Sequence, residues 1–479
     1  MDFTRSCHTS LGATCAKSAV VVAACPTSRS DTVEAHLAGQ RVIFTSDPDN
    51  IRAIFATQGG DFEKGQAFRD DWYVVLGDSI FTQDRERWHA SRQLLRPQFT
   101  HVLVSQLDIF EKHIQTLLRA FAGDWAAVAK PHEHARGIGL EIGVTAWIRR
   151  FTLDTATDFL FGKEVGSLCN EKDEFNRVLE TVKHIQLVRT RAGPLRFLWP
   201  KKSVESEMQK IDKVVYPHVD EALRRSKNIE DVKAPTRGYN MLDALAATSK
   251  NRVYLRDQAM SLLLAGRDTT SATLTWILYH IAKDEKVYLK LRTEVLDAVG
   301  TNPPSYTELK NMKYLQNITK EVLRLYPIPF NTRTAVKDTT LPRGGGPDGS
   351  LPIAILKGTG IALSTLELHR RQELMPPPSP ESPAVDVFYP ERWETWHPTP
   401  WHYIPFSGGP RICLGQQFAL ANLTYTIARV AQKFERLVYL GKAGELQVGI
   451  DVMMEPIDEI KIAFFESQSE VAIPNQNRP

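Results

Sequence analysis

The chain has 479 residues, of which 42% are hydrophobic and 24% charged, and its formal net charge is +3. This is the composition of an ordinary globular protein. Because it contains neither a Ser/Gly linker nor a repeat of fixed period, one large folded unit is favoured. So small a net charge, without a basic tract interleaved with aromatic residues, argues against a nucleic-acid partner. The five cysteines lack the short spacing of a zinc site, so we expect free thiols in a reducing compartment.

The first 35 residues are rich in Ser, Thr and Ala and show no periodicity, so we expect them to be poorly ordered. Their longest apolar run, residues 19–25, has about a third of the roughly 20 residues that a membrane-spanning helix needs. The run is followed by Pro26 and lacks the layout of a signal peptide. No transmembrane helix is predicted from this stretch.

From residue 41 a short strand and a turn lead into a helix that begins at Asp47 and Pro48, where the missing N–H of proline is harmless. The amphipathic segment 85–99 predicts a helix that ends near Pro97. Further helical patterns cover residues 104–122, 150–161, 171–190, 204–227, 240–250, 254–283, 284–299 and 307–326.

After Pro327 the pattern changes to short β-like pieces separated by Gly/Pro turns. One more long helix is expected between Cys413 and about Lys433. Helices dominate and the strands are short and late, so the sequence predicts a mainly α protein with small β-sheets.

The segment FSGGPRICLG, residues 406–415, surrounds one cysteine. A Gly-Gly-Pro turn precedes Cys413, and an apolar helix begins directly after the segment. A cysteine at the mouth of a helix faces unpaired backbone N–H groups and the positive end of the helix dipole, which both favour the thiolate. With the aromatic ring of Phe406 and the cation of Arg411 close in sequence, such a thiolate is suited to an iron porphyrin. A lone cysteine is more often a small buried apolar residue.

The surrounding residues decide between these two interpretations. Phe406, Gly408, Arg411, Cys413 and Gly415 match the haem-binding signature of the cytochrome P450 family at every defining position. Chance would produce such a match in a chain of this length on the order of once in ten thousand sequences or less. The chain is therefore identified as resembling a cytochrome P450 from about residue 36 to about residue 465.

The resemblance implies a single helix-rich, triangular catalytic domain, 36–465, followed by a tail, 466–479. It also implies haem b (iron protoporphyrin IX) between a long distal helix and a proximal helix, with the thiolate of Cys413 as the axial ligand of the iron.

Glu321 and Arg324 stand three residues apart in KEVLRLYP and share one helix face. Alone they would be an ordinary surface pair worth a fraction of a kcal/mol. They resemble the Glu-x-x-Arg pair of the family, which forms a structural charge cluster with an arginine like Arg392 in PERW. The resemblance assigns this cluster to folding and haem retention.

The predicted helix 254–283 carries AGRDTTS in its middle. Gly266 costs a helix about 1 kcal/mol relative to alanine, and a carboxylate such as Asp268 among apolar residues is expensive unless it is paired. Natural helices keep such faults mostly where function needs them. In the family this stretch crosses the distal face of the haem, which implies that Thr269 orders water and that Asp268 relays protons. From the residues alone, both could equally be polar groups on a solvated face.

The propionates of a haem favour arginine or tryptophan N–H donors. Trp88 and Arg92 are four residues apart, share one helix face and resemble the Trp-x-x-x-Arg pair of the family. Arg333 and Arg411 stand where the family places further propionate arginines. Each arginine taken alone is more often a surface residue.

Several long segments resemble the fungal subgroup that hydroxylates alkanes and fatty acids, namely residues 77–99, 151–162, 321–350 and 404–420. The segments 124–148 and 372–387 depart from the family pattern. The family builds its substrate pocket from variable stretches, which here are apolar and contain Phe68, Trp72, Phe197, Ile328, Phe330 and Met453. These variable stretches are residues 66–82, 183–200, 328–335 and 452–455. A lipophilic substrate is therefore expected, either a fatty-acyl or alkane-like chain or a fungal secondary metabolite.

The resemblance implies a monooxygenase that uses O2 and takes electrons from NADPH through NADPH-cytochrome P450 reductase, since the chain has no nucleotide-binding glycine loop. It also implies association with the endoplasmic reticulum membrane surface. One alternative is a haem-thiolate isomerase or peroxygenase without O2 activation, which would not need Asp268 and Thr269. The other is a non-catalytic haem- or lipid-binding decayed copy, which the two departing segments favour.

Overall fold

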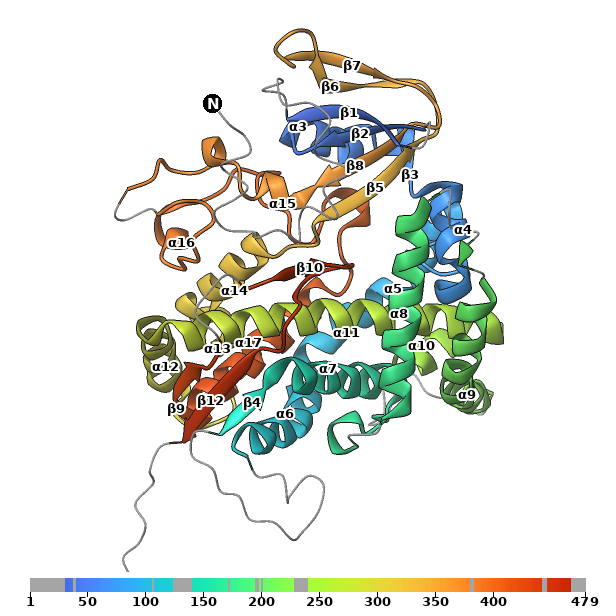
Figure 1. Cartoon of the computed structure of the whole chain (residues 1–479). Coiled ribbons are helices and arrows are strands. Elements are labelled where there is room, and N and C mark those ends of the chain that lie inside the picture. The colour runs from blue at the N-terminus through green and yellow to red at the C-terminus, as the bar shows by residue number, and fades with distance from the viewer. Residues whose placement is uncertain are drawn as a thin grey trace, which may run out of the picture.

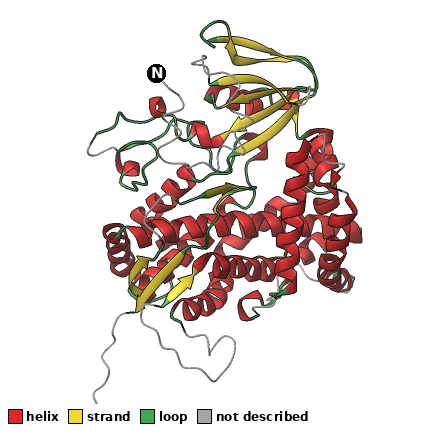
Figure 2. Cartoon of the chain, viewed as in Figure 1, coloured by secondary structure: helices red, strands yellow, loops and turns green. Residues whose placement is uncertain are grey.

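The structure is a computed structural model that describes residues 31–37, 40–105, 107–123, 140–170, 173–193, 198–199, 201–227, 240–379, 383–441 and 446–466. A helical body occupies most of the molecule, and a strand-rich part lies along one side of it (Figure 1). The predicted mainly α protein with small sheets is confirmed (Figure 2). The predicted N-terminal segment 1–35 and the tail 466–479 lie largely outside the described residues, although the first strand already begins at Thr32.

The α-helices of the described residues follow one another along the whole chain. They are α3 (Pro48–Arg52), α4 (Gly65–Leu76), α5 (Arg85–Ser105), α6 (Leu107–Phe121), α7 (Val144–Phe161), α8 (Glu174–Ala192), α9 (Lys201–Arg225), α10 (Met241–Thr248), α11 (Arg252–Lys283), α12 (Glu285–Val299), α13 (Tyr306–Asn311), α14 (Lys313–Leu325), α15 (Thr365–Leu368), α16 (Arg392–Thr395) and α17 (Gln416–Lys433).

The strands of the described residues form four small sheets. They are β1 (Thr32–Leu37), β2 (Gln40–Thr45), β3 (Phe62–Glu63), β4 (Glu141–Gly143), β5 (Phe330–Ala335), β6 (Thr339–Gly345), β7 (Leu351–Ile355), β8 (Gly360–Ser364), β9 (Phe434–Tyr439), β10 (Val448–Ile450), β11 (Met454–Pro456) and β12 (Lys461–Glu466). The largest sheet has the order β1-β2-β8-β5-β3, and only its β2–β8 pair is parallel. The others are β4-β12-β9, β6-β7 and β10-β11.

Helix α11 runs through the middle of the helical body and packs along α7 (Figure 1). Its 32 residues begin at the cap Asn251, whose side chain accepts hydrogen bonds from the backbone N–H groups of Val253 and Tyr254. Most of its side chains are buried, Trp276 and Leu274 among them. A helix that is buried on nearly every side forms the centre of a core rather than its cover.

Two predicted helix boundaries are wrong. Helix α5 does not end near Pro97 but continues to Ser105 with this proline inside it. A proline removes one backbone hydrogen bond, which the other turns of a 21-residue helix tolerate. The predicted helix 307–326 is divided at Met312, because the carboxylate of Glu294 on α12 accepts hydrogen bonds from the backbone of Tyr314 and Leu315 and starts α14 afresh.

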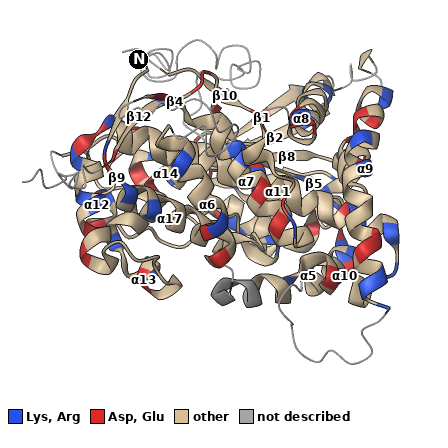
Figure 3. Ribbon diagram, turned by 90° about the horizontal axis from the view of Figure 1, so that it is seen from below, with Lys and Arg blue, Asp and Glu red and all other residues tan. Residues whose placement is uncertain are grey.

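Charged residues of both signs are mixed on the outer helices, including α9 and α12 (Figure 3). This distribution agrees with the small net charge of the chain. Within the described ranges, no helix is both long enough and apolar enough to cross a membrane.

Candidate functional site

The loop before Cys413 contains two glycines at which an added Cβ atom would lie too close to a neighbouring residue. Gly409 has a φ of +65°, and a Cβ atom there would lie 1.9 Å from the carbonyl oxygen of Phe55. A Cβ atom on Gly408 would lie 2.4 Å from the indole ring of Trp401. Positive φ favours glycine because it lacks a Cβ atom. The Gly-Gly turn therefore sets the path along which the chain approaches the cysteine.

Cys413 lies directly before α17. Its sulfur accepts backbone hydrogen bonds from Gly415 and Gln416, and its own N–H donates to the carbonyl oxygen of Phe406 at 3.0 Å. Burial raises the pKa of the Cys413 thiol, and the two N–H donors and the nearby guanidinium of Arg92 oppose that shift. A cation on the sulfur would add the positive charge that makes the thiolate the stable form. The donor set of this cysteine therefore fits a metal ligand.

The sulfur is surrounded by protein and is nevertheless accessible, because Cys413 lines a cavity of about 520 Å3 between α5 and the cysteine loop. Trp88 and Arg92 of α5 line the same cavity, as the spacing of the pair predicts. Arg92 donates a hydrogen bond to the carbonyl oxygen of Ile412 at 2.9 Å, which joins the helix to the loop.

Cations outnumber carboxylates beside this loop. Arg411 pairs with Asp84 at 2.6 Å. Arg333 is only 5% exposed, donates to the carbonyl oxygen of Thr332 at 2.7 Å, and has no ion pair within the described residues. Burial and the neighbouring Arg411 lower the pKa of Arg333 to about 9. A buried cation without a counter-charge is costly, so this place favours an anionic group.

Lys64 belongs to the same group of cations, and the sequence did not point to it. The pKa of its ammonium is well below the ordinary value because of burial and the nearby Arg333 and Arg411, and only Asp84 opposes the shift. Lys64 lies at the start of α4, where the Asp84 carboxylate accepts hydrogen bonds from the backbone of Lys64 and Gly65. No sequence motif marks it, because its neighbours come from distant parts of the chain.

One face of α11 stays accessible in the middle of this otherwise buried helix. Leu262, Ala265, Gly266 and Thr269 are all partly exposed and are spaced as one helix face, i, i+3, i+4 and i+7. A Cβ atom on Gly266 would meet no atom within 4 Å. The hydroxyl of Thr269 donates to the carbonyl oxygen of Ala265 at 2.6 Å. This face leaves room for a ligand that lies flat against the helix.

Asp268, next to that face, is 7% exposed and is paired on both of its oxygens. Arg267 donates to Oδ1 at 2.7 Å, and the ammonium of Lys183 on α8 lies 3.8 Å from Oδ2. Because its partners satisfy the carboxylate, its place among apolar residues does not leave a buried charge unpaired. The sequence identified this acid but not the partner on α8.

The predicted charge cluster of Glu321, Arg324 and Arg392 is brought together, with all three side chains at most 1% exposed. Arg324 binds both oxygens of Glu321, at 2.9 and 2.7 Å, and Arg392 lies 3.3 Å from one of them. Trp393 donates its indole N–H to Glu321 at 2.9 Å. The two arginines also donate to main-chain carbonyl oxygens of residues 383, 384, 385 and 387.

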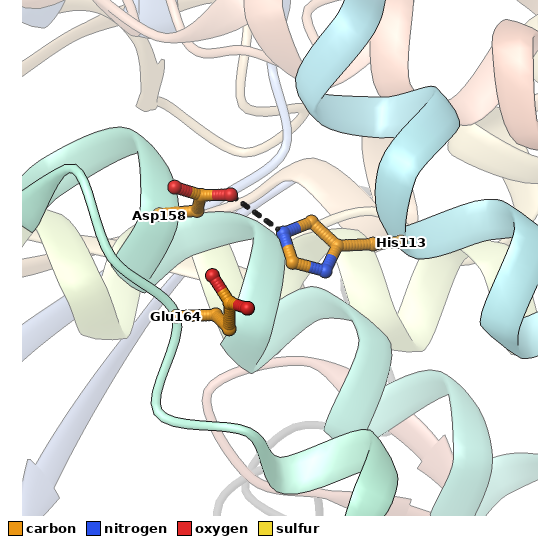
Figure 4. A group of neighbouring side chains, drawn as sticks. All are labelled: His113, Asp158 and Glu164. Atoms are coloured by element: carbon orange, nitrogen blue, oxygen red, sulfur yellow. Dashed lines mark hydrogen bonds and ion pairs between the residues drawn. The ribbon is translucent and has the colours of Figure 1, made fainter. Parts of the chain in front are cut away.

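Three side chains on α6, on α7 and just beyond α7 could in principle hold a second metal ion (Figure 4). His113 lies 2.9 Å from Asp158, and Glu164 is their neighbour. The ammonium of Lys112 is already 3.0 Å from Asp158 and 2.5 Å from Glu164. A bound lysine supplies the positive charge that a metal would bring, so we assign this group to the joining of α6 and α7.

The residues predicted to line a substrate pocket lie in different surroundings. Phe68 and Trp72 stack on α4 with their ring centres 6.1 Å apart, and Phe330 is 40% exposed at the start of β5. Ile328 is partly exposed, whereas Met453 is buried. Phe197 lies outside the described residues.

Comparisons with known proteins agree with this arrangement. The family profile described as Cytochrome P450 matches residues 17–456. The chain is 42% identical to cytochrome P450 monooxygenase pvhE of Talaromyces variabilis, over 91% of this chain and 82% of that protein. It is 37% identical to cytochrome P450 52A3-A of Candida maltosa, over 83% of this chain and 76% of that protein, which bears out the resemblance to a fungal subgroup.

A solved structure, the cytochrome P450DA heme domain, superposes with a TM-score of 0.71 at 21% identity and covers 91% of this chain and 89% of that one. At this identity the superposition shows that the fold is shared. With the match along nearly the whole chain and the cysteine at the mouth of α17, the chain belongs to the cytochrome P450 family of haem-thiolate monooxygenases.

Proposed function

We propose that the chain holds haem b through the thiolate of Cys413 and hydroxylates a lipophilic substrate with O2. The observation that carries the proposal is the environment of this sulfur. It accepts hydrogen bonds from two backbone N–H groups at the start of α17, and its residue lines a cavity. Haem, when bound there, supplies the activation of O2 and the oxidation of a C–H bond.

The cations near the cysteine loop would bind the two haem propionates. The pKa values of Arg333 and Lys64 are both lowered by burial and by neighbouring cations. Arg411 has Asp84 as its one ion-pair partner among the described residues. Two carboxylates added here would bring the missing negative charge. Trp88 and Arg92 line the cavity, and Phe406 accepts the N–H of Cys413, so these residues would fix the cysteine and the edge of the porphyrin.

On α11, the accessible face with Gly266 would lie against the porphyrin and leave space beside it. The Thr269 hydroxyl, held by the Ala265 carbonyl, can order water at that face. Asp268 can accept a proton from solvent and pass it toward Thr269, which is the role of a general acid–base group. Arg267 keeps the carboxylate in place at 2.7 Å while it does so.

The substrate follows from the apolar stretches around α4 and β5, where Phe68, Trp72 and Phe330 lie. We expect a fatty-acyl or alkane-like chain or a fungal secondary metabolite. The electrons come from NADPH through NADPH-cytochrome P450 reductase, which we expect to find with this protein at the surface of the endoplasmic reticulum. Fractionation of cells that express the tagged protein tests the location, and recovery in the cytosol alone would contradict it.

The first experiment is the absorption spectrum of the purified, dithionite-reduced protein under carbon monoxide. We expect the strongly red-shifted Soret band of a thiolate-bound haem. Cys413→Ser should lose this band, and Cys169→Ser, a change at an exposed free cysteine far along the chain, should keep it. A wild-type protein without haem, or with a less shifted band, would refute the proposal.

The second experiment separates the oxygenase from an isomerase or peroxygenase. Reductase, NADPH and lauric acid are added to the protein, and hydroxylated product is measured in the wild type and in Thr269→Ala. The proposal requires NADPH-dependent product that falls at least about tenfold in the variant. Turnover with hydrogen peroxide alone, unchanged by the substitution, would instead favour the peroxygenase.

A further inference from the structure

The C-terminal half of α11, which packs against α14 and β9, carries a row of aromatic side chains that leads from the core to the surface (Figure 1). Trp276 is 1% exposed and meets Tyr279 edge to face, with the ring centres 5.8 Å apart. Tyr279 meets Tyr439 of β9 in the same way at 5.0 Å. Both spacings are those of favourable aromatic pairs. Because Tyr439 is partly exposed, this aromatic row of Trp276, Tyr279 and Tyr439 connects the interior with solvent.

The inner end of the aromatic row lies on the helix face that we assign to the haem. Thr269 and Trp276 are separated by about two turns of α11, so they share one face of the helix. The distance between them along the helix axis is roughly 10 Å. Around Gly266 and Thr269 this face is accessible, whereas at Trp276 it is buried. Trp276 is therefore an easily oxidised side chain that continues the haem-facing surface into the core.

A second tyrosine is attached to the inner end of the row. Tyr326, just beyond α14, stacks on Trp276 with the ring centres 3.8 Å apart and the ring planes at 4°. Its hydroxyl lies 3.0 Å from Nε2 of His280. Burial lowers the pKa of His280 to about 3, so the ring is neutral and its Nε2 can accept the hydrogen bond. The hydroxyl of Tyr326 thus has a proton acceptor inside the protein.

The tyrosines of this region differ in where their proton could go if an electron were removed. The hydroxyl of Tyr279 accepts a hydrogen bond from the ammonium of Lys283 at 3.2 Å, and a neighbouring cation opposes the loss of an electron. Tyr279 is therefore a packing contact between Trp276 and Tyr439 and not a site at which a radical would rest. Tyr439 can release its proton to water, and Tyr326 can pass its proton to His280.

We infer that the aromatic row, with the Tyr326–His280 pair beside it, carries electrons from the protein surface to the haem and gives this protein a second activity, the reduction of hydrogen peroxide by a thiol. The inference rests on the proposed function, because haem must be bound at Cys413. Haem, when bound there, supplies the reduction of the peroxide that forms when O2 is consumed without hydroxylation. The path provides the electrons that would otherwise be taken from the porphyrin and the residues around it.

Each electron moves in steps whose protons are accounted for. Trp276 gives one electron to the haem, and Tyr326 replaces it. A phenol that has lost an electron is a strong acid, so the proton of Tyr326 moves along the hydrogen bond to Nε2 of His280. An electron from Tyr439 then restores Tyr326, which takes its proton back, while Tyr439 releases its own proton to water. A thiol returns a hydrogen atom to Tyr439. Two such rounds convert one hydrogen peroxide and two thiols into two waters and one disulfide.

The test uses the substrate-free holoenzyme treated with hydrogen peroxide. In one series a nitroso spin trap is present, and the residues that carry the trap are mapped by peptide mass spectrometry. In a second series glutathione is the thiol, and the loss of the haem absorption band and the formation of glutathione disulfide are followed. The variants are Trp276→Phe and Tyr439→Phe, which keep an aromatic ring but remove a side chain that is easily oxidised. Tyr216→Phe is the matched control, because Tyr216 is a partly exposed tyrosine of α9 that contacts Arg252.

In the wild type we expect the spin trap on Tyr439. Trp276→Phe should lose this adduct although Tyr439 is still present, which separates electron transfer through the row from direct oxidation at the surface. Glutathione should slow the loss of haem in the wild type at least about threefold, because repair and damage compete as parallel rates. This protection, and the disulfide that accompanies it, should vanish in Trp276→Phe and Tyr439→Phe and remain in the control.

Tyr326→Phe and His280→Gln test the proton step. Phenylalanine keeps the ring stacked on Trp276, and glutamine can still accept a hydrogen bond, but neither variant can move a proton between the two side chains. Both should lose the signal of a hydrogen-bonded tyrosyl radical in freeze-quenched electron paramagnetic resonance and keep the adduct on Tyr439. The initial rate of lauric acid hydroxylation with reductase and NADPH should stay within about twofold in all of these variants.

An absent adduct on Tyr439 in the wild type, or an adduct that persists in Trp276→Phe, would overturn the inference. If Trp276→Phe fails to bind haem, the surface variant Tyr439→Phe decides, and unchanged protection by glutathione there would count against the path. A wild-type protein without the red-shifted carbon monoxide band refutes the proposed function instead. In that case a photoexcited ruthenium complex serves as the oxidant in solution, and the path requires that oxidation of the buried Trp276 fall in Tyr439→Phe.

Discussion

The guanidinium carbon of Arg411 lies 4.4 Å from the centre of the Trp88 ring, so the cysteine loop and α5 are joined by a cation–π contact. Such a contact is worth about 2 kcal/mol when it is desolvated. Arg92 lies one turn further along α5, and its guanidinium carbon is 5.7 Å from the centre of the same Trp88 ring. Trp88 is therefore shared by two arginines, one from the cysteine loop and one from its own helix.

The unpaired charge of Arg333 predicts effects of opposite sign on the protein and on its cofactor. Arg333→Leu should stabilise the haem-free protein, because it removes a buried cation without an ion pair among the described residues. The same variant should lose haem faster, because a propionate partner is missing. Transfer of haem to excess apomyoglobin measures the rate of loss. Equal rates in the wild type and the variant would contradict this assignment.

Two glycines of the cysteine loop should respond differently to the same substitution. Gly409→Ala places a Cβ atom 1.9 Å from the Phe55 carbonyl oxygen at a φ of +65°, so we expect little or no haem-containing protein. Gly415→Ala meets only the Phe99 ring, at 3.6 Å, in an ordinary conformation, and should give protein with normal haem content. The ratio of haem to protein after purification is the measurement. Equal ratios for the two variants would show that the turn is not restricted to glycine.

Glu321→Gln should be among the most damaging single substitutions in the chain. It leaves Arg324 and Arg392 buried without their carboxylate, which costs about 3–5 kcal/mol. Glu141→Gln breaks an exposed pair with Lys461 and should change the free energy of unfolding by less than about 1 kcal/mol. Urea unfolding followed by circular dichroism compares the two. A loss below about 1 kcal/mol in Glu321→Gln would mean that the cluster contributes little.

Gly266→Ala should separate stability from activity. A methyl group there meets no atom within 4 Å, and alanine is favoured over glycine in a helix by about 1 kcal/mol, so the free energy of unfolding of the haem-free protein should rise. Turnover should fall, because the methyl group occupies the space beside the proposed haem. A variant that is less stable than the wild type would show that this face of α11 is packed.

The buried histidines predict how stability depends on pH. Burial lowers the pKa of His280 and of His369 to about 3 each, against about 6.5 in the unfolded chain. The unfolded state therefore takes up protons first, and stability is full above about pH 6.5 and falls toward pH 3. Each histidine contributes a slope of about 1.4 kcal/mol per pH unit in this window.

The variant His280→Phe tests that slope. The ring can keep its stacking on Phe388 but loses the hydrogen bond to Tyr326, which costs about 1 kcal/mol at pH 7. Between pH 6 and 5 the free energy of unfolding in urea should fall less steeply than in the wild type, by about 1.4 kcal/mol per pH unit. An unchanged slope would show that His280 does not remain neutral.

The parts of the site that the sequence predicted are those with local signatures. Cys413 has its glycine turn and the helix start beside it, and Glu321 has Arg324 three residues away, so short-range geometry identifies them. Lys64 and Lys183 have no such signature, because the residues that give them a role come from other elements. The same is true of Glu294, whose carboxylate caps α14 from α12 and divides a helix that periodicity predicts as continuous. Hydrophobic periodicity predicts which face of a single element is buried, but it does not predict which side chains of an adjacent element will contact that face.

Arg324 and Arg392 donate to the main-chain oxygens of residues 383, 384, 385 and 387, and not to their side chains. Every residue type presents the same oxygen, so this attachment does not depend on which amino acids stand there. The end of the segment 372–387, which departs from the family pattern, is thus anchored through its backbone at these four positions. A substitution at the exposed Ala384 or Val387 therefore keeps the hydrogen bonds of the two buried arginines, and with them the attachment of this segment to α14.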